Sequence, residues 1–401
     1  MYIEAAVCRA QAFPRQTYPV ASFTACGATR SRRGSHASMS AIKIQRVALP
    51  KGVTPKCEIC GEPAEYRCSK CPTHYCTVRH FDIDWKGILH LIYQDVAALA
   101  ERPAAGTEKE REKRKQESAA LQSKILAVSG ATAKAWINKG EYQLAVAGAL
   151  YALKMAERLY GHQAVEAVPA YLLLAEIYLE LEQLSSASDL LTLASWSLFK
   201  NSGNHDALRP LLYRNFGRLY SAQNRCDEAL KACAMDVYCS TETYGPDAFE
   251  TALSYYYMAR AFDKSTRPMR CAFRFYGQVC NIYLSWFEET ERQAGPAITA
   301  TEPPSVNDKE RTRDIGIDEA IKITRQIQRH TENALGAQHK LANVALLANA
   351  VLLASIGNYE EAVSQLNHAS ARIEKAFGSD HALGSRCQAY MEAVKRRQTK
   401  S

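Results

Sequence analysis

Small residues recur along the chain at a fixed interval. Gly161, Gly203 and Gly245 lie 42 residues apart, and Gly336 and Gly378 keep the same spacing. A series of alanines repeats in the same phase, with a glycine sixteen residues after the alanine in five of six units: Ala145, Ala187, Ala229, Ala272, Ala320 and Ala362. A period of this length across most of a chain predicts an array of stacked supersecondary units.

The residues around these markers predict two helices in each unit. The stretch KGEYQLAVAGALYALKMAERLYG opens with a turn glycine and continues as one amphipathic helix to Gly161. Ala145 lies early in that helix, where a small side chain lets the neighbouring helix approach closely, and Gly161 suits the left-handed residue that ends a helix. The stretch VPAYLLLAEIYLEL is apolar at helical spacing and reads as an inner helix. The predicted fold class is therefore all-α, a superhelical solenoid of helical hairpins.

One unit departs from the pattern. The spacing from Ala272 to Ala320 is 48 residues, and Glu288 stands where the glycine is expected. The stretch 293–310, QAGPAITATEPPSVNDKE, is rich in Pro, Thr and Glu, which are poor material for a packed helix. We expect an exposed loop that interrupts the array here, followed by a shortened inner helix.

Three closely spaced pairs of ligand-type residues predict a zinc finger. Cys57 and Cys60 form one C-x-x-C pair and Cys68 and Cys71 a second, while Cys76 and His80 are one helical turn apart. These spacings let two side chains turn onto one ion, and Zn²⁺ takes four such ligands in a tetrahedron. Because so short a segment has no core of its own, metal binding must supply its folding energy. Ligand cysteines imply a reducing compartment.

The remaining cysteines of the folded region lie on apolar helical stretches. We expect buried, inert thiols there: Cys226, Cys233, Cys239, Cys271, Cys280 and Cys387.

The net charge of +8 is concentrated at the start of the chain. Residues 1–56 hold nine Lys or Arg and one Glu, which leaves 41 basic and 41 acidic residues in 57–401. The folded part is neutral overall, so we expect no nucleic-acid partner. No apolar run approaches the roughly 18 residues that a membrane span needs, so no membrane partner is expected either. For residues 1–38 we favour initiation at Met39, or a disordered extension, over a targeting segment.

The stretch CEICGEPAEYRCSKCPTHYCTVRHFDIDW resembles a MYND finger. The resemblance implies a complete first zinc site of Cys57, Cys60, Cys76 and His80. It implies a second site of Cys68 and Cys71 with His90, which lies one residue later than in the family.

In that second site Tyr93 stands near the place of the family's last cysteine, and His74 is an alternative ligand. We therefore expect one firmly held Zn²⁺ and leave the second open. MYND fingers often bind proline-containing peptides through a glutamine and a tryptophan; here Phe81 replaces the glutamine and Trp85 is kept. A finger that caps the end of the solenoid is an equal alternative.

The array resembles tetratricopeptide repeats in the 42-residue variant of kinesin light chains, over roughly residues 120–395. The expected organisation is a disordered basic tail at 1–56, the finger at 57–93, a charged helical linker at 94–119 that includes EKEREKRKQE, the repeats at 120–395, and a short tail at 396–401.

The sequence predicts a protein that is not an enzyme. It contains no G-x-x-x-x-G-K-[ST], G-x-S-x-G or H-E-x-x-H motif. A SET-type methyltransferase is not expected, since the finger runs directly into the repeats. The order of finger, charged helix and repeats is similar to that of MYND-finger proteins of ciliary axonemes. That resemblance implies a scaffold associated with inner dynein arms, with another tetratricopeptide-repeat protein as partner. The alternative is a transcriptional or chromatin adaptor in the nucleus or cytoplasm.

Overall fold

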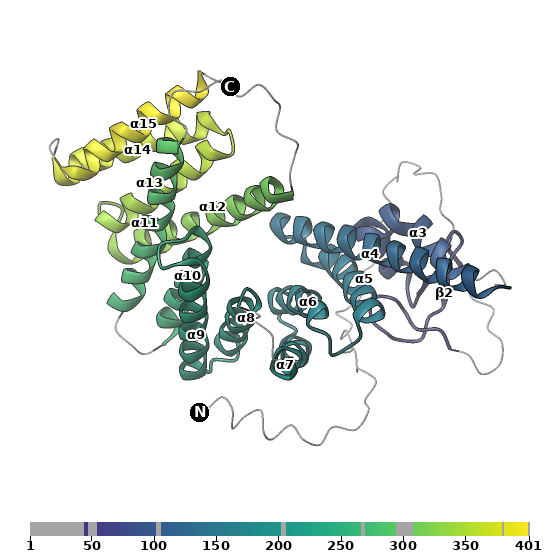
Figure 1. The fold of residues 1–401 in the computed structure, drawn as a ribbon. Helices are drawn as coiled ribbons and strands as arrows, with labels where there is room; N and C mark the ends of the chain where they lie inside the picture. Colours follow the sequence, from purple (N-terminus) through teal and green to yellow (C-terminus); the bar gives the residue numbers. More distant parts are fainter. Residues whose placement is uncertain are drawn as a thin grey trace, which may run out of the picture. The chain divides into compact units, whose positions relative to one another are not determined.

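The computed structural model describes residues 44–46, 54–101, 106–201, 206–265, 269–293, 308–378 and 381–399. The chain divides into two compact units. The first holds the described residues up to Ala133 together with Val146–Met155, and the second holds Lys134–Ala145 and Ala156 onward. The ribbon of each unit can be followed in Figure 1.

The first unit begins with a small three-stranded antiparallel sheet in the order β1-β2-β3. The strands are β1 (Ile44–Arg46), β2 (Tyr66–Cys68) and β3 (His74–Tyr75). Three helical segments follow without a break: α2 (Val78–Asp84), the π-helical turn η2 (Trp85–Leu89) and α3 (His90–Ala100).

The strand β1 lies within the segment that was expected to be a disordered tail. Ile44 pairs with Cys68 and Arg46 with Tyr66, and the Ile44 side chain packs against the core of the finger. The expectation of a disordered tail at 1–56 was therefore wrong for residues 44–46. It was also wrong at its end, where Lys56 forms a β-bridge with Pro63. Residues 1–43 and 47–53 lie outside the described residues.

The helix α4 (Glu108–Lys139) is a single segment of 32 residues. The expected boundary between linker and repeats, at residues 119 and 120, falls inside it. The charged run at its start is made of strong helix formers, and no proline interrupts the segment, so the helix passes continuously into its apolar part. That part contributes the buried residues Ile125, Ser129 and Ala133.

The array continues as a series of helices. They are α5 (Tyr142–Tyr160), the 3-10 turn η3 (Val165–Ala167), α6 (Val168–Glu180), α7 (Leu184–Lys200), α8 (Leu208–Ala222), α9 (Cys226–Tyr244), α10 (Phe249–Lys264), α11 (Arg270–Gln293), α12 (Asp308–Leu335), α13 (Lys340–Ser355), α14 (Tyr359–Phe377) and α15 (Ala382–Gln398). Within the second unit, α6 with α7, α8 with α9, α10 with α11 and α13 with α14 form adjacent packed pairs. The prediction of a helical-repeat solenoid with a small N-terminal zinc-binding region is confirmed.

The small-residue markers occupy equivalent places in the helices. The six repeat alanines are all buried, at 0% or 1% exposure: Ala145, Ala187, Ala229, Ala272, Ala320 and Ala362. Four of the repeat glycines follow the last residue of their helix with φ between 86° and 98°: Gly161, Gly245, Gly336 and Gly378. Side chains at such φ values are strained, which explains the recurrence of glycine there. Gly203 lies outside the described residues.

The irregular unit lies between α11 and α13. The helix α11 has 24 residues and α12 has 28, and in the described part of the chain no separate inner helix stands between them. The expected shortened inner helix is therefore not seen there. Instead α11 packs directly against α13. The expected loop at 293–310 begins where α11 ends, and α12 starts within it at Asp308; residues 294–307 lie outside the described residues.

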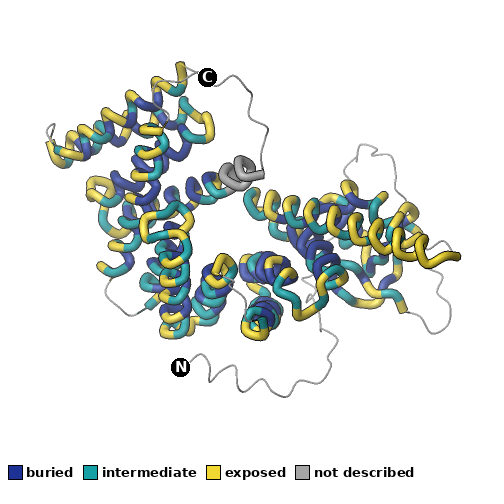
Figure 2. Tube along the Cα trace, in the orientation of Figure 1, coloured by how far each residue is buried: buried dark blue, intermediate teal, exposed yellow. Residues whose placement is uncertain are grey.

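Along many of the helices, buried residues alternate with exposed ones (Figure 2). The helix α13 is the exception, since every residue from Ala342 to Ala354 is buried. It is enclosed by α11, α12, α14 and α15. Fully buried helices are apolar on all sides, and here the two polar side chains Asn343 and Asn349 each donate hydrogen bonds to neighbouring backbone carbonyls.

A buried polar cluster joins three helices of the second unit. The Arg214 guanidinium on α8 donates to Asp236 Oδ2 on α9 at 3.1 Å and to Ser254 Oγ on α10 at 2.9 Å. Asp236 Oδ1 accepts from Ser240 and Ser254. A charged pair of this kind is tolerated in a core because its remaining polar atoms are also hydrogen-bonded.

In the described part of the chain, no helix is both long enough and apolar enough to cross a membrane.

Candidate metal centre

The first pair of finger cysteines is carried by a tight turn. The Gly61 amide donates to the Cys57 carbonyl at 3.0 Å, and Gly61 has φ 73°, a left-handed value that glycine adopts readily. The Cys57 amide in turn donates to the Glu62 carbonyl at 2.8 Å. The turn places the thiols of Cys57 and Cys60 on the same side of the backbone.

Cys76 and His80 are carried by the end of a strand and by the capped helix that follows it. Cys76 follows β3 directly, and Thr77 is the N-cap of α2. The Thr77 hydroxyl accepts a hydrogen bond from the His80 amide at 3.3 Å. A threonine N-cap satisfies one of the free amides of the first turn. His80 therefore lies in that first turn, one turn after Cys76.

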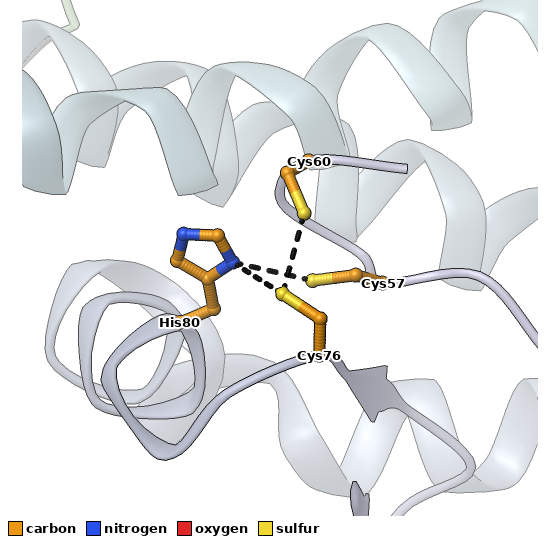
Figure 3. Close-up of side chains that lie close together, drawn as sticks. All are labelled: Cys57, Cys60, Cys76 and His80. Atoms are coloured by element: carbon orange, nitrogen blue, oxygen red, sulfur yellow. Dashed lines mark hydrogen bonds between the residues drawn. The ribbon is translucent and has the colours of Figure 1, made fainter. Parts of the chain in front are cut away.

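These elements bring four ligand atoms together (Figure 3). The three sulfur atoms and a His80 ring nitrogen all lie within 4.8 Å of one another. Cys76 Sγ is 3.1 Å from His80 Nδ1 and 3.4 Å from Cys60 Sγ, and Cys57 Sγ is 3.5 Å from His80 Nδ1. Among the residues that the structure describes, this is the one group of three or more ligand-type side chains that could hold a metal ion.

The protonation of these thiols is set by their crowding. Burial raises the pKa of the Cys57 thiol, but its hydrogen bonds to His80 and to backbone amides outweigh burial and lower the pKa to about 6. Burial raises the pKa of Cys60 to about 12, and it also raises the pKa of Cys76. Three thiolates this close repel one another in the absence of a cation, and a divalent ion removes that repulsion.

The group has the composition and the size of a structural zinc site. Bonds of about 2.0–2.3 Å to a central Zn²⁺ place tetrahedral ligand atoms about 3.3–3.8 Å apart, close to the separations in this cluster. Three thiolates and one imidazole fill all four positions, so no open position remains for water or substrate. The residues present therefore fit a Zn²⁺ that is held for structure.

The residues expected at the second site do not gather in the same way. The thiols of Cys68 and Cys71 are buried and interact with each other, and this hydrogen bond is the main reason why the pKa of Cys68 is lowered to about 6. Cys71 Sγ lies 3.2 Å from Thr73 Oγ1. His90 is exposed, and its Nδ1 is 2.8 Å from the Trp85 carbonyl oxygen. The structure thus gives Cys68 and Cys71 no third ligand from His90 within the described residues.

His90 misses the second site because of the helix geometry around it. The turn η2 from Trp85 to Leu89 is π-helical, so one more residue than usual is wound in before His90. This places His90 beside Trp85, on the exposed side of the segment. The extra residue between Trp85 and His90 was visible in the sequence, but the π-helical turn that accommodates it was not.

The residues considered for peptide binding form an aromatic cluster. Phe81 is buried, lies edge-on to Tyr75 at 5.4 Å, and stacks on Trp85 at 6.0 Å between ring centroids. Tyr93 covers Trp85 from another side at 5.9 Å. Phe81 is therefore a core residue of the finger and not an exposed contact residue.

The finger shares its core with the first helical hairpin inside the same unit. Ile125 of α4 and Tyr151 and Met155 of α5 belong to one apolar cluster with the buried finger residues. Lys154 Nζ forms an ion pair with Glu58 at 2.7 Å. A finger packed in this way acts as a cap on the hairpin, which agrees with the capping alternative.

A buried carboxyl group lies at the centre of this packing. Asp84 is fully buried, and its Oδ2 accepts hydrogen bonds from Tyr75 at 2.5 Å and from Tyr151 at 3.5 Å. Its other oxygen finds no hydrogen-bond partner among the residues that the structure describes. Burial raises the pKa of Asp84 to about 7. Sequence reasoning did not single out this residue, because nothing in the local spacing indicates that it faces inward.

Three of the six scattered cysteines of the array are buried packing residues, as expected, and the other three are not fully buried. Cys233, Cys280 and Cys387 are buried at 0% or 1% exposure. Burial raises the pKa of Cys233 and of Cys280 to about 12 and that of Cys387 to about 11. Cys226, Cys239 and Cys271 are half-buried.

Family models match a segment of the finger and a segment of the repeats. Residues 53–79 match the HIT zinc finger, and residues 350–383 match the tetratricopeptide repeat. The first match covers three of the four clustered ligands and ends just before His80; the second covers the end of α13, α14 and the start of α15. The finger is thus similar to zinc fingers of the HIT type, a class related to MYND. The zinc finger and the tetratricopeptide repeat together indicate a protein-interaction scaffold that holds Zn²⁺, and a repeat fold of this kind is typical of proteins that are not enzymes.

Proposed function

We propose that this protein is a non-enzymatic scaffold of the ciliary or flagellar axoneme, where it docks or forms part of an inner dynein arm. The proposal rests on the similarity of its order of finger, charged helix and repeats to axonemal MYND-finger proteins. Its partners are dynein-arm components and another tetratricopeptide-repeat protein.

The observation that supports a scaffold most directly is that the finger and the repeats have different roles. The buried residues of the finger form one apolar cluster with residues of α4 and α5, so a metal that holds the finger together also stabilises the start of the array. The repeats from α6 to α15 offer an extended surface built from stacked hairpins, the kind of surface that helical or extended segments of other proteins bind.

Fractionation of ciliated cells tests the location. Membranes are removed with detergent, and the axonemes are then extracted with salt. We expect the protein to stay with the detergent-stripped axonemes and to leave in the same extract as inner dynein arms. A nuclear adaptor would instead be recovered with nuclei and be absent from stripped axonemes, and this result would reject the proposal.

A variant with a damaged array separates the roles of finger and repeats. Ala187→Arg introduces a charge at a fully buried position of α7, and we expect this variant to retain zinc but to be lost from axonemes. Ser185→Arg, at an exposed position of the same helix, is the matched control and is expected to incorporate normally.

A further inference from the structure

A groove in the C-terminal part of the array collects basic side chains. It has a volume of about 650 Å³ and is lined by the first half of α11, the end of α12, and the starts of α13 and α15. Four of its lining residues carry a permanent positive charge, Arg270, Arg274, Lys340 and Arg386. Among the described residues that line it, none is acidic.

Within the described residues, one of the four cations is paired with a carboxylate and three are not. Arg386 forms an ion pair with Glu288 at 2.9 Å. In the described part of the chain no such ion pair joins a carboxylate to Arg270, Arg274 or Lys340, and all three are exposed. Unpaired cations that converge on one concavity produce a positive potential, which low-dielectric walls strengthen.

Two helix N-termini add to this potential. The N-caps of α13 and α15 are His339 and His381, and both line the groove. Each imidazole accepts a hydrogen bond through Nδ1 from the backbone amide two residues later, at 3.2 Å and 3.1 Å. The positive ends of two helix dipoles therefore face the same concavity as the three cations.

The floor of the groove is apolar. It includes Phe273, Leu341 and Leu383. Gly277 on α11 lies beside Leu341, and an added Cβ there would meet Leu341 Cδ1 at 3.5 Å, an ordinary contact distance. A site for a small inorganic anion would need few apolar walls, whereas an apolar floor with a charged rim suits a peptide with both kinds of side chain.

We propose that this groove docks an acidic peptide segment of a partner protein, whose carboxylates meet Arg270, Arg274 and Lys340 while an apolar side chain covers the floor beside Gly277. The positive side chains require a negatively charged partner, and the apolar floor favours a peptide over nucleic acid. This inference rests on the proposed scaffold function and names the chemistry of one of its partners.

The test measures fluorescence anisotropy of a labelled peptide of glutamates with one central leucine, titrated with the full chain. We expect saturable binding that weakens as salt is raised, because exposed charge pairs are screened. A peptide with glutamine in place of every glutamate is expected to bind at least about tenfold more weakly. Equal affinity for the two peptides would overturn the proposal.

Two variants test the two halves of the groove. Arg270→Glu combined with Arg274→Glu reverses the charge at exposed positions and should weaken binding by about tenfold or more. Gly277→Leu fills the floor without changing any charge and should also weaken binding. Arg209→Glu, at an exposed position of α8, is the control and should bind normally. Circular dichroism melting checks that every variant is folded.

Several outcomes would reject this assignment. Binding that survives the double charge reversal, or that is unaffected by Gly277→Leu, would mean that the peptide is attracted to the surface without entering the groove. Displacement of the peptide by equimolar phosphate would indicate a small-anion site, and tighter binding of duplex DNA at the same residues a nucleic-acid site. The location proposal fails separately, since absence from axonemes leaves this binding assay unchanged.

Discussion

The phenol of Tyr75 donates a 2.5 Å hydrogen bond to the fully buried carboxylate of Asp84. Tyr75 ends the last strand of the finger and Asp84 ends the helix that carries His80. The same carboxylate receives a longer hydrogen bond, at 3.5 Å, from Tyr151 of α5. One buried acid thus ties the strand, the ligand-bearing helix and the first hairpin together.

The first prediction concerns the pH dependence of this contact. Burial raises the pKa of Asp84 to about 7, while an unfolded aspartate has a pKa of about 3.9. Between these values the unfolded chain has lost the proton and the folded chain retains it, so Asp84 lowers the free energy of unfolding as pH rises from about 4 to about 7. The cost is at most about 4 kcal/mol, at 1.4 kcal/mol per pKa unit.

Asp84→Asn keeps an oxygen acceptor for Tyr75 and removes the titration. We expect the variant to be less sensitive to pH than the wild type, and relatively more stable at pH 8 than at pH 5. Urea unfolding at both pH values measures this. The zinc ligands titrate in both proteins, so the difference between them isolates Asp84. Identical pH profiles for the two proteins would show that Asp84 is ionised in the fold.

The second prediction is one tightly held Zn²⁺ per chain. The ligand atoms of Cys57, Cys60, Cys76 and His80 are clustered, while the thiols of Cys68 and Cys71 have no third ligand from His90. Cys57→Ser should lose the metal and unfold the finger, but the helices of the distant repeats should stay folded, because each repeat depends mainly on its neighbours. Metal analysis combined with circular dichroism gives both results.

Cys68→Ser is the matched control for the metal count. It should keep its zinc, since it changes a residue outside the clustered group. Two zinc ions per wild-type chain that both resist a chelator would contradict the prediction and would require Cys68 and Cys71 to find further ligands.

The array was more predictable from the sequence than the finger was. The positions of Ala145 and Gly161 follow from local geometry, a close helix contact and a helix end. The alanine recurs in all six units and the glycine in five of them, so the period reveals both. The pair Tyr75 and Asp84 has no repeat, and its contact with Tyr151 spans 67 residues of sequence. Spacing carries no information about such pairs.

The lack of a local signal also explains two other features that were not predicted from the sequence. The ion pair of Arg214 with Asp236 could not be predicted, because in the sequence both residues look like ordinary surface charges on a helix. The strand β1 was missed because Ile44 has a partner only once the finger supplies Cys68. In each case the partner lies on another element, and the local sequence gives no sign of it.

The third prediction tests the close packing of the repeats. Ala187 is fully buried in α7, and Ala187→Arg would bury an unpaired charge, at an expected cost of about 3–5 kcal/mol. Ser185→Arg on the exposed side of the same helix should change stability by no more than about 0.5 kcal/mol. Chemical unfolding provides the comparison. Equal effects of the two substitutions would mean that α7 is not packed as the structure has it.

The last prediction concerns a close helix contact that the repeat pattern did not reveal. Gly217 on α8 faces Cys233 on α9, and a Cβ at position 217 would lie 2.5 Å from Cys233 Sγ. Gly217→Ala therefore forces the buried thiol or the helix to move, and overpacking of this kind costs about 1–3 kcal/mol. This exceeds the roughly 1 kcal/mol by which alanine is favoured over glycine inside a helix, so we expect a net loss of stability.

A second substitution should reverse that loss. Cys233→Ala removes the sulfur atom that the new methyl group meets, so the double variant should be more stable than Gly217→Ala alone, and the two changes should be non-additive by more than about 0.5 kcal/mol. Gly130→Ala in α4 is the control, because an added Cβ there meets nothing within 4 Å; it should stabilise the chain. Urea unfolding of the wild type, the two single variants and the double variant tests this prediction. Additive effects of the two substitutions would show that the glycine at position 217 is kept for a reason other than contact with Cys233.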